Sequence, residues 1–154
     1  MDKLIEYPKL IKRILTEYVE LCRHPQPDIE TFLIADEQNG HYIWMNLGWQ
    51  KGDRITGITV YVRIGDGKFW IEEDWTEDGI ATDLVRAGVP KEDIVLAFHE
   101  PGMRQYTDFA AASWRSFNLT PGVQNRQANH PEIPAILPVE FASKLRYQSA
   151  EKWQ

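Results

Sequence analysis

The fold class of this chain is decided by residues 28–74, DIETFLIADEQNGHYIWMNLGWQKGDRITGITVYVRIGDGKFWIEED. The stretch contains four runs rich in β-branched and aromatic residues, which are residues 29–36, 41–49, 54–64 and 68–73. Short turn signals separate the runs. The first of them, Asn39-Gly40, is typical of a two-residue hairpin, because both central residues of such a turn need positive φ. The stretch therefore predicts an antiparallel meander of four strands.

Helical patterns flank the predicted meander on both sides. Residues 3–22 place apolar side chains at spacings of three and four, which is the pattern of a helix with one buried face. Proline is tolerated in the first turn of a helix, so we expect the regular helix to begin near Tyr7, with Pro8 at its first position. Residues 79–87 predict a short helix that a glycine ends, and residues 93–98 predict an apolar strand. The order α-β-β-β-β-α-β defines an α+β fold.

The predicted sheet carries large side chains on both faces, but the N-terminal helix covers only one of them. We therefore expect the other face to be covered by a second helix, the tail or another chain, and we predict a homodimer through it. Residues 1–112 are expected to form the α+β domain. Residues 113–154 contain four prolines and show little periodicity. They are expected to be an extension that packs on this domain or on a neighbouring subunit.

Composition excludes several classes of protein. A hydrophobic fraction of 43% is typical of a globular chain. No apolar run approaches the roughly 18 residues that a membrane span needs, and the charged N-terminus lacks the pattern of a secretory signal. The single cysteine, Cys22, fits a reducing compartment, so we expect a cytoplasmic protein with this residue in its core.

The negative charge of the chain is concentrated in one window. Residues 72–93 hold eight acids and two bases, so they account for the whole formal charge of −6. Affinity for nucleic acid comes mainly from Lys and Arg side chains that neutralise phosphates, and no dense basic stripe is present. Direct, autonomous DNA binding is therefore not expected.

The densest acidic stretch is WIEEDWTEDGIA, residues 70–81. Asp74 and Glu77 have the spacing of a capping box, with Asp74 as the N-cap and Glu77 at the third helical position. The two glutamates before Asp74 are expected to alternate across the end of the strand. The alternative is a metal-dependent hydrolase or nuclease in which Asp74, Glu77 and His99 supply ligands. The known metal and nucleophile motifs are missing, so the cap is favoured and no cofactor is expected.

Tryptophans lie on or beside the predicted meander. For each of them a place in the core is the favoured interpretation. Together with an acidic rim they also suit a partner surface, in which aromatic side chains anchor and charges orient the contact. The candidate interface residues are Trp49, Trp70, Trp75, His99 and Arg104. A further alternative is a module that binds a small ligand in an apolar cleft lined by the tryptophans.

Three stretches of the sequence carry a family resemblance. GKFWIEEDWTEDGIATDLVRAGVPKEDIVLAFHEP (67–101), continued by Arg104, resembles the fdxN element excision controlling factor family, the XisI-like proteins, which are largely cyanobacterial. KRILTEY (12–18) and LGWQ (47–50) match this family as well. The resemblance covers about residues 2–112.

The resemblance implies a small α+β protein with a role in the programmed excision of a DNA element. It also implies partners, namely a recombinase and a companion excision factor of nuclease-like fold. It provides no catalytic role for Asp74, Glu77 or His99. The leading hypothesis is therefore a non-enzymatic accessory protein that binds a nuclease-like or recombinase partner.

Overall fold

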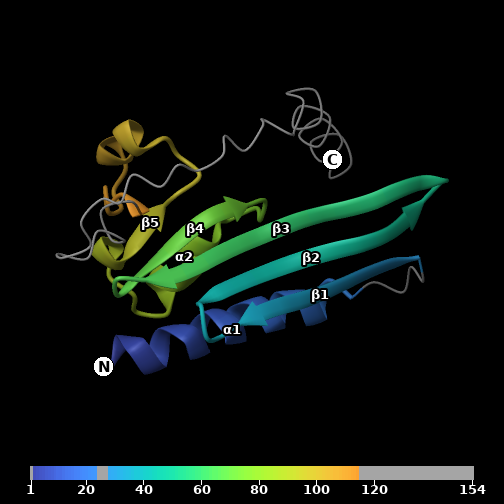
Figure 1. The fold of residues 1–154 in the computed structure, drawn as a ribbon, viewed down its shortest axis with the longest axis horizontal. Coiled ribbons are helices and arrows are strands. Elements are labelled where there is room, and N and C mark those ends of the chain that lie inside the picture. Colours follow the sequence, from blue (N-terminus) through green and yellow to red (C-terminus); the bar gives the residue numbers. More distant parts are fainter. Residues whose placement is uncertain (1, 24–27, 115–154) are drawn as a thin grey trace, which may run out of the picture. The chain divides into compact units, whose positions relative to one another are not determined.

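The structure is a computed structural model that describes residues 2–23 and 28–114. The elements of these residues are α1 (Lys3–Leu21), β1 (Ile29–Asp36), β2 (His41–Gln50), β3 (Asp53–Gly65), β4 (Lys68–Asp74), α2 (Ile80–Arg86), η1 (Lys91–Asp93), β5 (Ile94–Leu96) and η2 (Pro101–Tyr106), shown in Figure 1. The predicted α+β fold and its order of elements are confirmed. Of the predicted C-terminal extension, residues 113–154, the part from residue 115 onward lies outside the described residues.

The five strands form one sheet in the order β1-β2-β3-β4-β5. The first four strands are antiparallel neighbours joined by short turns, as predicted. The prediction that Asn39-Gly40 forms a two-residue hairpin is wrong, because residues 37–40 separate Asp36 from its partner His41 and only Gly40 of the two has positive φ. Strand β5 runs parallel to β4. Parallel neighbours need a crossover connection rather than a hairpin, and the segment with α2 and η1 provides it.

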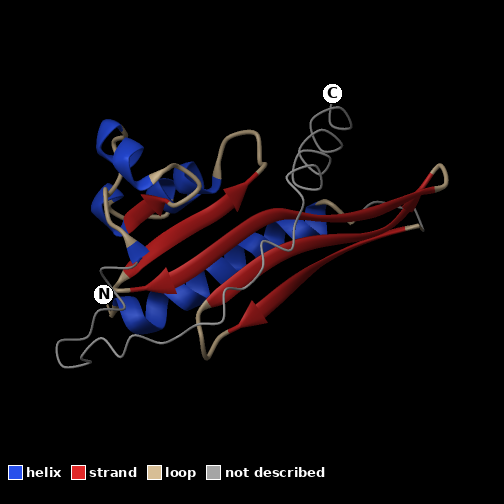
Figure 2. Ribbon diagram, turned by 45° about the horizontal axis from the view of Figure 1, so that its top comes forward, coloured by secondary structure: helices blue, strands red, loops and turns tan. Residues whose placement is uncertain are grey.

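Helix α1 packs along one face of the sheet, as Figure 2 shows. The core consists mainly of buried apolar side chains from the helix and from the three inner strands, including Tyr7, Ile11, Leu15, Val19, Tyr42, Trp44, Val60, Val62, Phe69 and Ile71. Alternate residues of each strand point to this face, because side chains in a strand alternate between the two faces. No helix in the described ranges is long and apolar enough to cross a membrane.

Helix α1 begins at Lys3, so the prediction that it starts near Tyr7 is wrong, and Pro8 lies inside the helix. Asp2 is the N-cap, and its carboxylate accepts a hydrogen bond of 3.1 Å from the backbone N–H of Leu4. Pro8 has no N–H for the carbonyl of Leu4. Leu4 is 80% exposed, so water can replace the missing donor at this first turn.

An irregularity between β3 and β4 decides which acidic side chains share a face. Tyr61 pairs with Glu73 and Arg63 pairs with Trp70, so Glu72 is an extra residue in β4. A β-bulge of this kind interrupts the alternation of side chains. Glu72 and Glu73 therefore lie on the same face of the sheet as Tyr61 and Arg63. The prediction that these two glutamates alternate between the faces is wrong.

Candidate functional site

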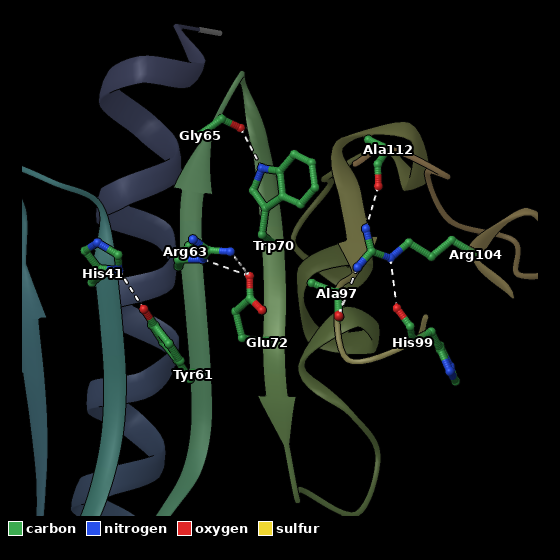
Figure 3. A network of polar contacts seen from close by, with 10 residues as sticks. All are labelled: His41, Tyr61, Arg63, Gly65, Trp70, Glu72, Ala97, His99, Arg104 and Ala112. Carbon is green, nitrogen blue, oxygen red and sulfur yellow. Dashed lines mark hydrogen bonds and ion pairs between the residues drawn. The ribbon is translucent and has the colours of Figure 1, made fainter. Parts of the chain in front are cut away.

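The face of the sheet opposite α1 carries a band of polar contacts, drawn in Figure 3. Arg63 on β3 forms an ion pair with Glu72 on β4, and its Nε donates a hydrogen bond of 2.8 Å to the Glu72 carboxylate. On the other side of Arg63, the His41 Nδ1 atom on β2 lies 2.8 Å from the Tyr61 hydroxyl oxygen on β3. The band therefore consists of two cross-strand pairs, the Arg63–Glu72 ion pair and the His41–Tyr61 hydrogen bond.

The charges of this band act on Tyr61. Burial raises the pKa of the Tyr61 phenol, the positive charge of Arg63 lowers it, and the negative charge of Glu72 raises it again. The net result is a pKa above the ordinary value of about 10 for tyrosine. The phenol therefore stays neutral at physiological pH and serves as a hydrogen-bonding group.

Trp70 is only 1% exposed, which corrects the prediction that it lies at a partner interface. Its indole N–H donates a hydrogen bond of 2.8 Å to the backbone carbonyl of Gly65. Trp114 lies edge-on to it, with ring centroids 5.0 Å apart, and the Arg63 guanidinium lies 3.8 Å from the centre of the Trp114 ring. These aromatic and cation–π contacts are stabilising, and they make Trp70 part of a second, smaller packing layer.

Arg104 is buried as well, so it does not present its charge to a partner as predicted. Its guanidinium donates hydrogen bonds to the backbone carbonyls of Ala97 at 3.0 Å, His99 at 3.0 Å and Ala112 at 2.7 Å. Figure 3 shows the three carbonyls converging on this one group. Arg104 therefore fixes the shape of the turn that follows β5.

The turn fixed by Arg104 presents large apolar side chains to solvent. Phe98 is 48% exposed, Met103 53% and Tyr106 76%. The exposed His99 lies beside Phe98, with ring centroids 4.7 Å apart. We call Phe98, His99, Met103 and Tyr106 the apolar turn. Exposed aromatic and methionine side chains on a well-anchored segment are typical of contact sites for other proteins.

His99 of the apolar turn is among the predicted interface residues, whereas Phe98 and Met103 were missed. The sequence contains one signal for Phe98. The apolar run 93–98 is longer than the strand, because β5 ends at Leu96. A bulky apolar residue that lies beyond the end of its strand and directly before a turn is a candidate for exposure.

The acidic loop between β4 and α2 is organised by Asp74. One carboxylate oxygen accepts hydrogen bonds from the backbone N–H and the hydroxyl of Thr76, at 3.0 and 2.6 Å. The other oxygen accepts a hydrogen bond of 2.6 Å from the backbone N–H of Ile80. Asp74 thus satisfies the first N–H of helix α2 from six residues upstream.

A capping box with Asp74 as N-cap does not form. Helix α2 begins at Ile80, and the N-cap position belongs to Gly79, whose φ of 82° suits glycine. Glu77 lies in the loop before the helix and is exposed. Residues 74–79 connect the end of β4 to the start of α2. The three-residue spacing of Asp74 and Glu77 therefore does not mark the start of the helix.

Trp75 and Trp49 are both half exposed, at 50% and 55%, but they lie on different parts of the sheet. Trp75 follows β4, and its indole N–H donates a hydrogen bond of 2.8 Å to Glu73. Trp49 lies near the tip of the β2–β3 hairpin, with the Arg54 guanidinium 5.3 Å from the centre of its ring. Trp75 and the apolar turn follow the ends of two parallel strands, so they leave the sheet in the same direction. Trp49 does not.

The two alternative kinds of site require particular arrangements of side chains. Among the residues that the structure describes, no group of three His, Cys, Asp or Glu is placed to hold a metal ion. Asp74 uses both carboxylate oxygens to bind Thr76 and Ile80. A hollow of about 420 Å³ lies along β1. The described residues that line it are Arg23, Ile29, Glu30, Thr31 and Phe32, with no tryptophan among them.

The fold and surface define a small α+β protein in which a long helix covers one face of a five-stranded mixed sheet. An anchored apolar turn and an acidic loop follow its parallel strands. The chain belongs to the XisI protein family, whose sequence profile matches residues 1–111.

Solved structures agree with the family assignment. A XisI-like protein from Anabaena variabilis ATCC 29413 is 43% identical, covers 71% of this chain and 99% of its own length, and superposes with a TM-score of 0.67. The fdxN element excision controlling factor XisI from the same organism is 41% identical, covers 72% of this chain and 100% of its own length, and gives a TM-score of 0.64. No curated protein sequence matches the chain. The predicted family is confirmed.

Proposed function

We propose that this protein is an accessory factor in the excision of a DNA element, and that it acts by binding a partner protein of nuclease-like fold or a recombinase. The role in excision is supported by membership of the XisI family and by the similarity to a protein named as an excision controlling factor. The action through a partner protein is supported by the surface of the molecule.

The observation that carries the proposal is the apolar turn. Its exposed aromatic and methionine side chains lie on a segment that Arg104 fastens through three hydrogen bonds. A rigid apolar surface loses little conformational entropy when a partner covers it. Such side chains contribute most of the binding free energy at protein interfaces.

The acidic loop gives this surface a preferred kind of partner. Residues 72–78 contain five carboxylates, and Glu73, Glu77 and Asp78 of these have no basic ion-pair partner in the described part of the chain. Nucleases and recombinases carry Lys and Arg for binding phosphates. Opposite charges at an interface steer association and set orientation. The protein therefore binds a basic surface of its partner and does not bind DNA by itself.

Co-purification with the product of the adjacent gene tests the proposal. We expect a complex at micromolar concentration without added DNA. The double substitution Phe98→Ala and Tyr106→Ala removes two anchors, and it is expected to weaken the complex by about tenfold or more. Trp49→Ala is the matched control, because the exposed fraction of Trp49 lies between those of Phe98 and Tyr106, but Trp49 lies near the hairpin tip. Absence of a complex with the wild-type protein, or equal weakening by Trp49→Ala, contradicts the proposal.

A further inference from the structure

Strand β1 forms one outer edge of the sheet, as Figure 2 shows, and its hydrogen bonds reveal which backbone groups are free. In an antiparallel ladder, residues whose N–H and C=O face the neighbouring strand alternate with residues whose N–H and C=O face away. The Asp28 carbonyl accepts from the N–H of Trp49 at 2.9 Å, and the Asp36 carbonyl accepts from the N–H of Gly40 at 2.8 Å. The even-numbered residues of β1 therefore face β2. The residues whose backbone groups face outward are Ile29, Thr31, Leu33 and Ala35.

The outward groups of β1 are available for pairing. Within residues 2–23 and 28–114, no hydrogen bond between backbone groups reaches the outer side of this strand. Ala35 is exposed and Ile34 is 42% exposed, as expected for a strand without a neighbour on one side. The edge is therefore a row of free donors and acceptors.

Strand β1 also lacks the features that protect sheet edges. Natural proteins protect an exposed edge by making the strand very short, by placing Lys or Pro in it, or by a bulge. Strand β1 has eight residues and contains no Lys, Arg, Pro or Gly, and its two charged residues, Glu30 and Asp36, lie near its two ends. It pairs with β2 without a shift of register. A long, regular and mainly apolar edge strand of this kind is a template for another strand.

The other free edges of the sheet are protected. Strand β5 has three residues. Strand β4 continues beyond β5 as Glu72-Glu73-Asp74, where negative charge opposes pairing. Strand β3 pairs with β4 only from Val60 of β3 onward. The part of β3 that precedes Val60 has no neighbour on this side, and it ends in a bulge at Thr59. Among the residues that the structure describes, β1 is therefore the one unprotected edge.

We propose that β1 pairs antiparallel with β1 of a second copy of this chain across a two-fold axis. A second copy has the same free edge. When two such edges pair, the outward donors and acceptors of both β1 strands find partners. Because the described part of each copy has one unprotected edge, this isologous contact closes at the dimer and does not continue into a fibre. The sheet becomes continuous across the two molecules.

The outward backbone groups of β1 limit the register of the pair. An axis at Phe32 places Thr31 opposite Leu33 and leaves Glu30 opposite the apolar Ile34. Thr31 and Leu33 both have outward backbone groups, so they form a hydrogen-bonded pair that exchanges two bonds. An axis at Leu33 instead places Glu30 opposite Asp36, and like charges directly opposite each other are destabilising. An axis at Phe32 in turn places Asp36 opposite Asp28, the residue directly before β1, so each register has a like-charge pair and charge does not choose between them.

This contact differs from the homodimer predicted through the open face of the sheet, because it uses the edge. It is also independent of the proposed function, since the apolar turn lies beyond β5 at the opposite edge of the sheet. Partner binding and dimer formation are therefore separately testable.

Amide hydrogen exchange measured at high and low protein concentration tests the dimer. We expect the amides of Thr31, Leu33 and Ala35 to be protected at high concentration and to exchange faster on dilution, when light scattering reports a monomer. The amides of Phe32 and Ile34 face β2 and stay protected at both concentrations. A monomer at every concentration, or a dimer in which the three outward amides exchange freely, overturns the proposal. So does protection of these amides only when the product of the adjacent gene is added.

A matched pair of variants gives a second test. Ala35→Pro removes one outward N–H and keeps every β1–β2 hydrogen bond, and proline is tolerated in edge strands. Ala35→Ser keeps the outward N–H at the same exposed position. We expect Ala35→Pro to weaken the dimer by about tenfold or more and Ala35→Ser to leave it within about twofold. Equal dimerisation of the two variants contradicts the edge contact. If Ala35→Pro does not fold, as judged by circular dichroism, the exchange pattern of the wild-type protein decides.

Discussion

The phenol of Tyr7 donates a hydrogen bond of 2.5 Å to the carboxylate of Asp93, joining residues 86 positions apart in the sequence. Lys3 binds the same carboxylate at 2.6 Å. Asp93 is only 7% exposed, so its charge is held inside the protein by these two partners. Through them the first turns of α1 are fastened to η1, directly before β5.

Tyr7→Phe is expected to lower the free energy of unfolding by about 2 kcal/mol, because Asp93 stays buried and loses one donor. Tyr18→Phe is the matched control. The phenol of Tyr18 also binds a carboxylate, that of Asp83 at 2.6 Å, but the Asp83 side chain is 20% exposed and water can replace the donor. We expect a loss of about 1 kcal/mol for this variant. Urea unfolding measures both, and an equal or larger loss for Tyr18→Phe contradicts the role of Asp93 burial.

Acid is expected to weaken the fold through Asp93. Burial raises the pKa of this carboxyl, but hydrogen bonds from Lys3 and Tyr7 and the charge of Lys3 outweigh burial, so the pKa lies below its ordinary value. The unfolded chain then binds this proton at a higher pH than the folded chain. The contribution of Asp93 to stability is therefore complete above about pH 4 and is lost as the pH falls through the lowered pKa.

Urea unfolding of the wild-type protein and of Asp93→Asn, from about pH 6 to about pH 3, measures this contribution. Asn cannot ionise, so the stability gap between the two proteins is expected to narrow toward acid. Lys3→Met raises the pKa of Asp93 and moves the acid-induced loss to higher pH. A gap that stays constant over the whole range shows that Asp93 does not titrate between the folded and unfolded states.

Much of the fold was predictable because its signals are local. Asn39-Gly40 and the two later glycine turns mark the hairpins, and the spacing of apolar residues marks α1. The parallel pairing of β5 with β4 was not predicted, since a short apolar strand carries no mark of its neighbour. The faces of Glu72 and Glu73 were predicted wrongly because the bulge depends on how β4 pairs with β3, and alternation within one strand contains no information on this pairing.

The candidate site was predicted less well, and the reasons differ from residue to residue. A charged residue in a turn is usually solvated, but Arg104 is surrounded by three carbonyls that only the folded chain brings together. Trp70 is buried because Trp114 and Arg63 cover it on the face away from α1. The contact with Trp114 joins residues far apart in the sequence, and no local pattern predicts it.

Asp74→Ala is expected to destabilise the protein by about 1–2 kcal/mol, the usual cost of losing a helix cap, because the first N–H of α2 and the Thr76 hydrogen bonds lose their acceptor. Glu77→Ala is the control from the same loop. Glu77 is exposed, and its replacement is expected to change stability by less than about 0.5 kcal/mol. Thermal or urea unfolding measures the difference. Comparable losses of stability for the two variants would indicate that Asp74 and Glu77 form a capping box.

Arg104→Lys tests whether the apolar turn is shaped from within. A lysine ammonium is a compact charge on a flexible stem and does not reproduce the fixed fork of a guanidinium, so it cannot serve the carbonyls of Ala97, His99 and Ala112 together. We expect a loss of about 2–3 kcal/mol in the free energy of unfolding. Arg13→Lys is the control, because the Arg13 side chain on α1 is exposed. This substitution is expected to change the free energy of unfolding little.

The same variant separates stability from binding. Under conditions where Arg104→Lys is fully folded, its affinity for the partner is still expected to fall, because Phe98 and Tyr106 lose their fixed positions although the Arg104 side chain is buried and touches no partner. The affinity is measured with the product of the adjacent gene, beside the Phe98→Ala and Tyr106→Ala double variant. If Arg104→Lys lowers stability and leaves the affinity unchanged, the partner binds a different surface of the protein.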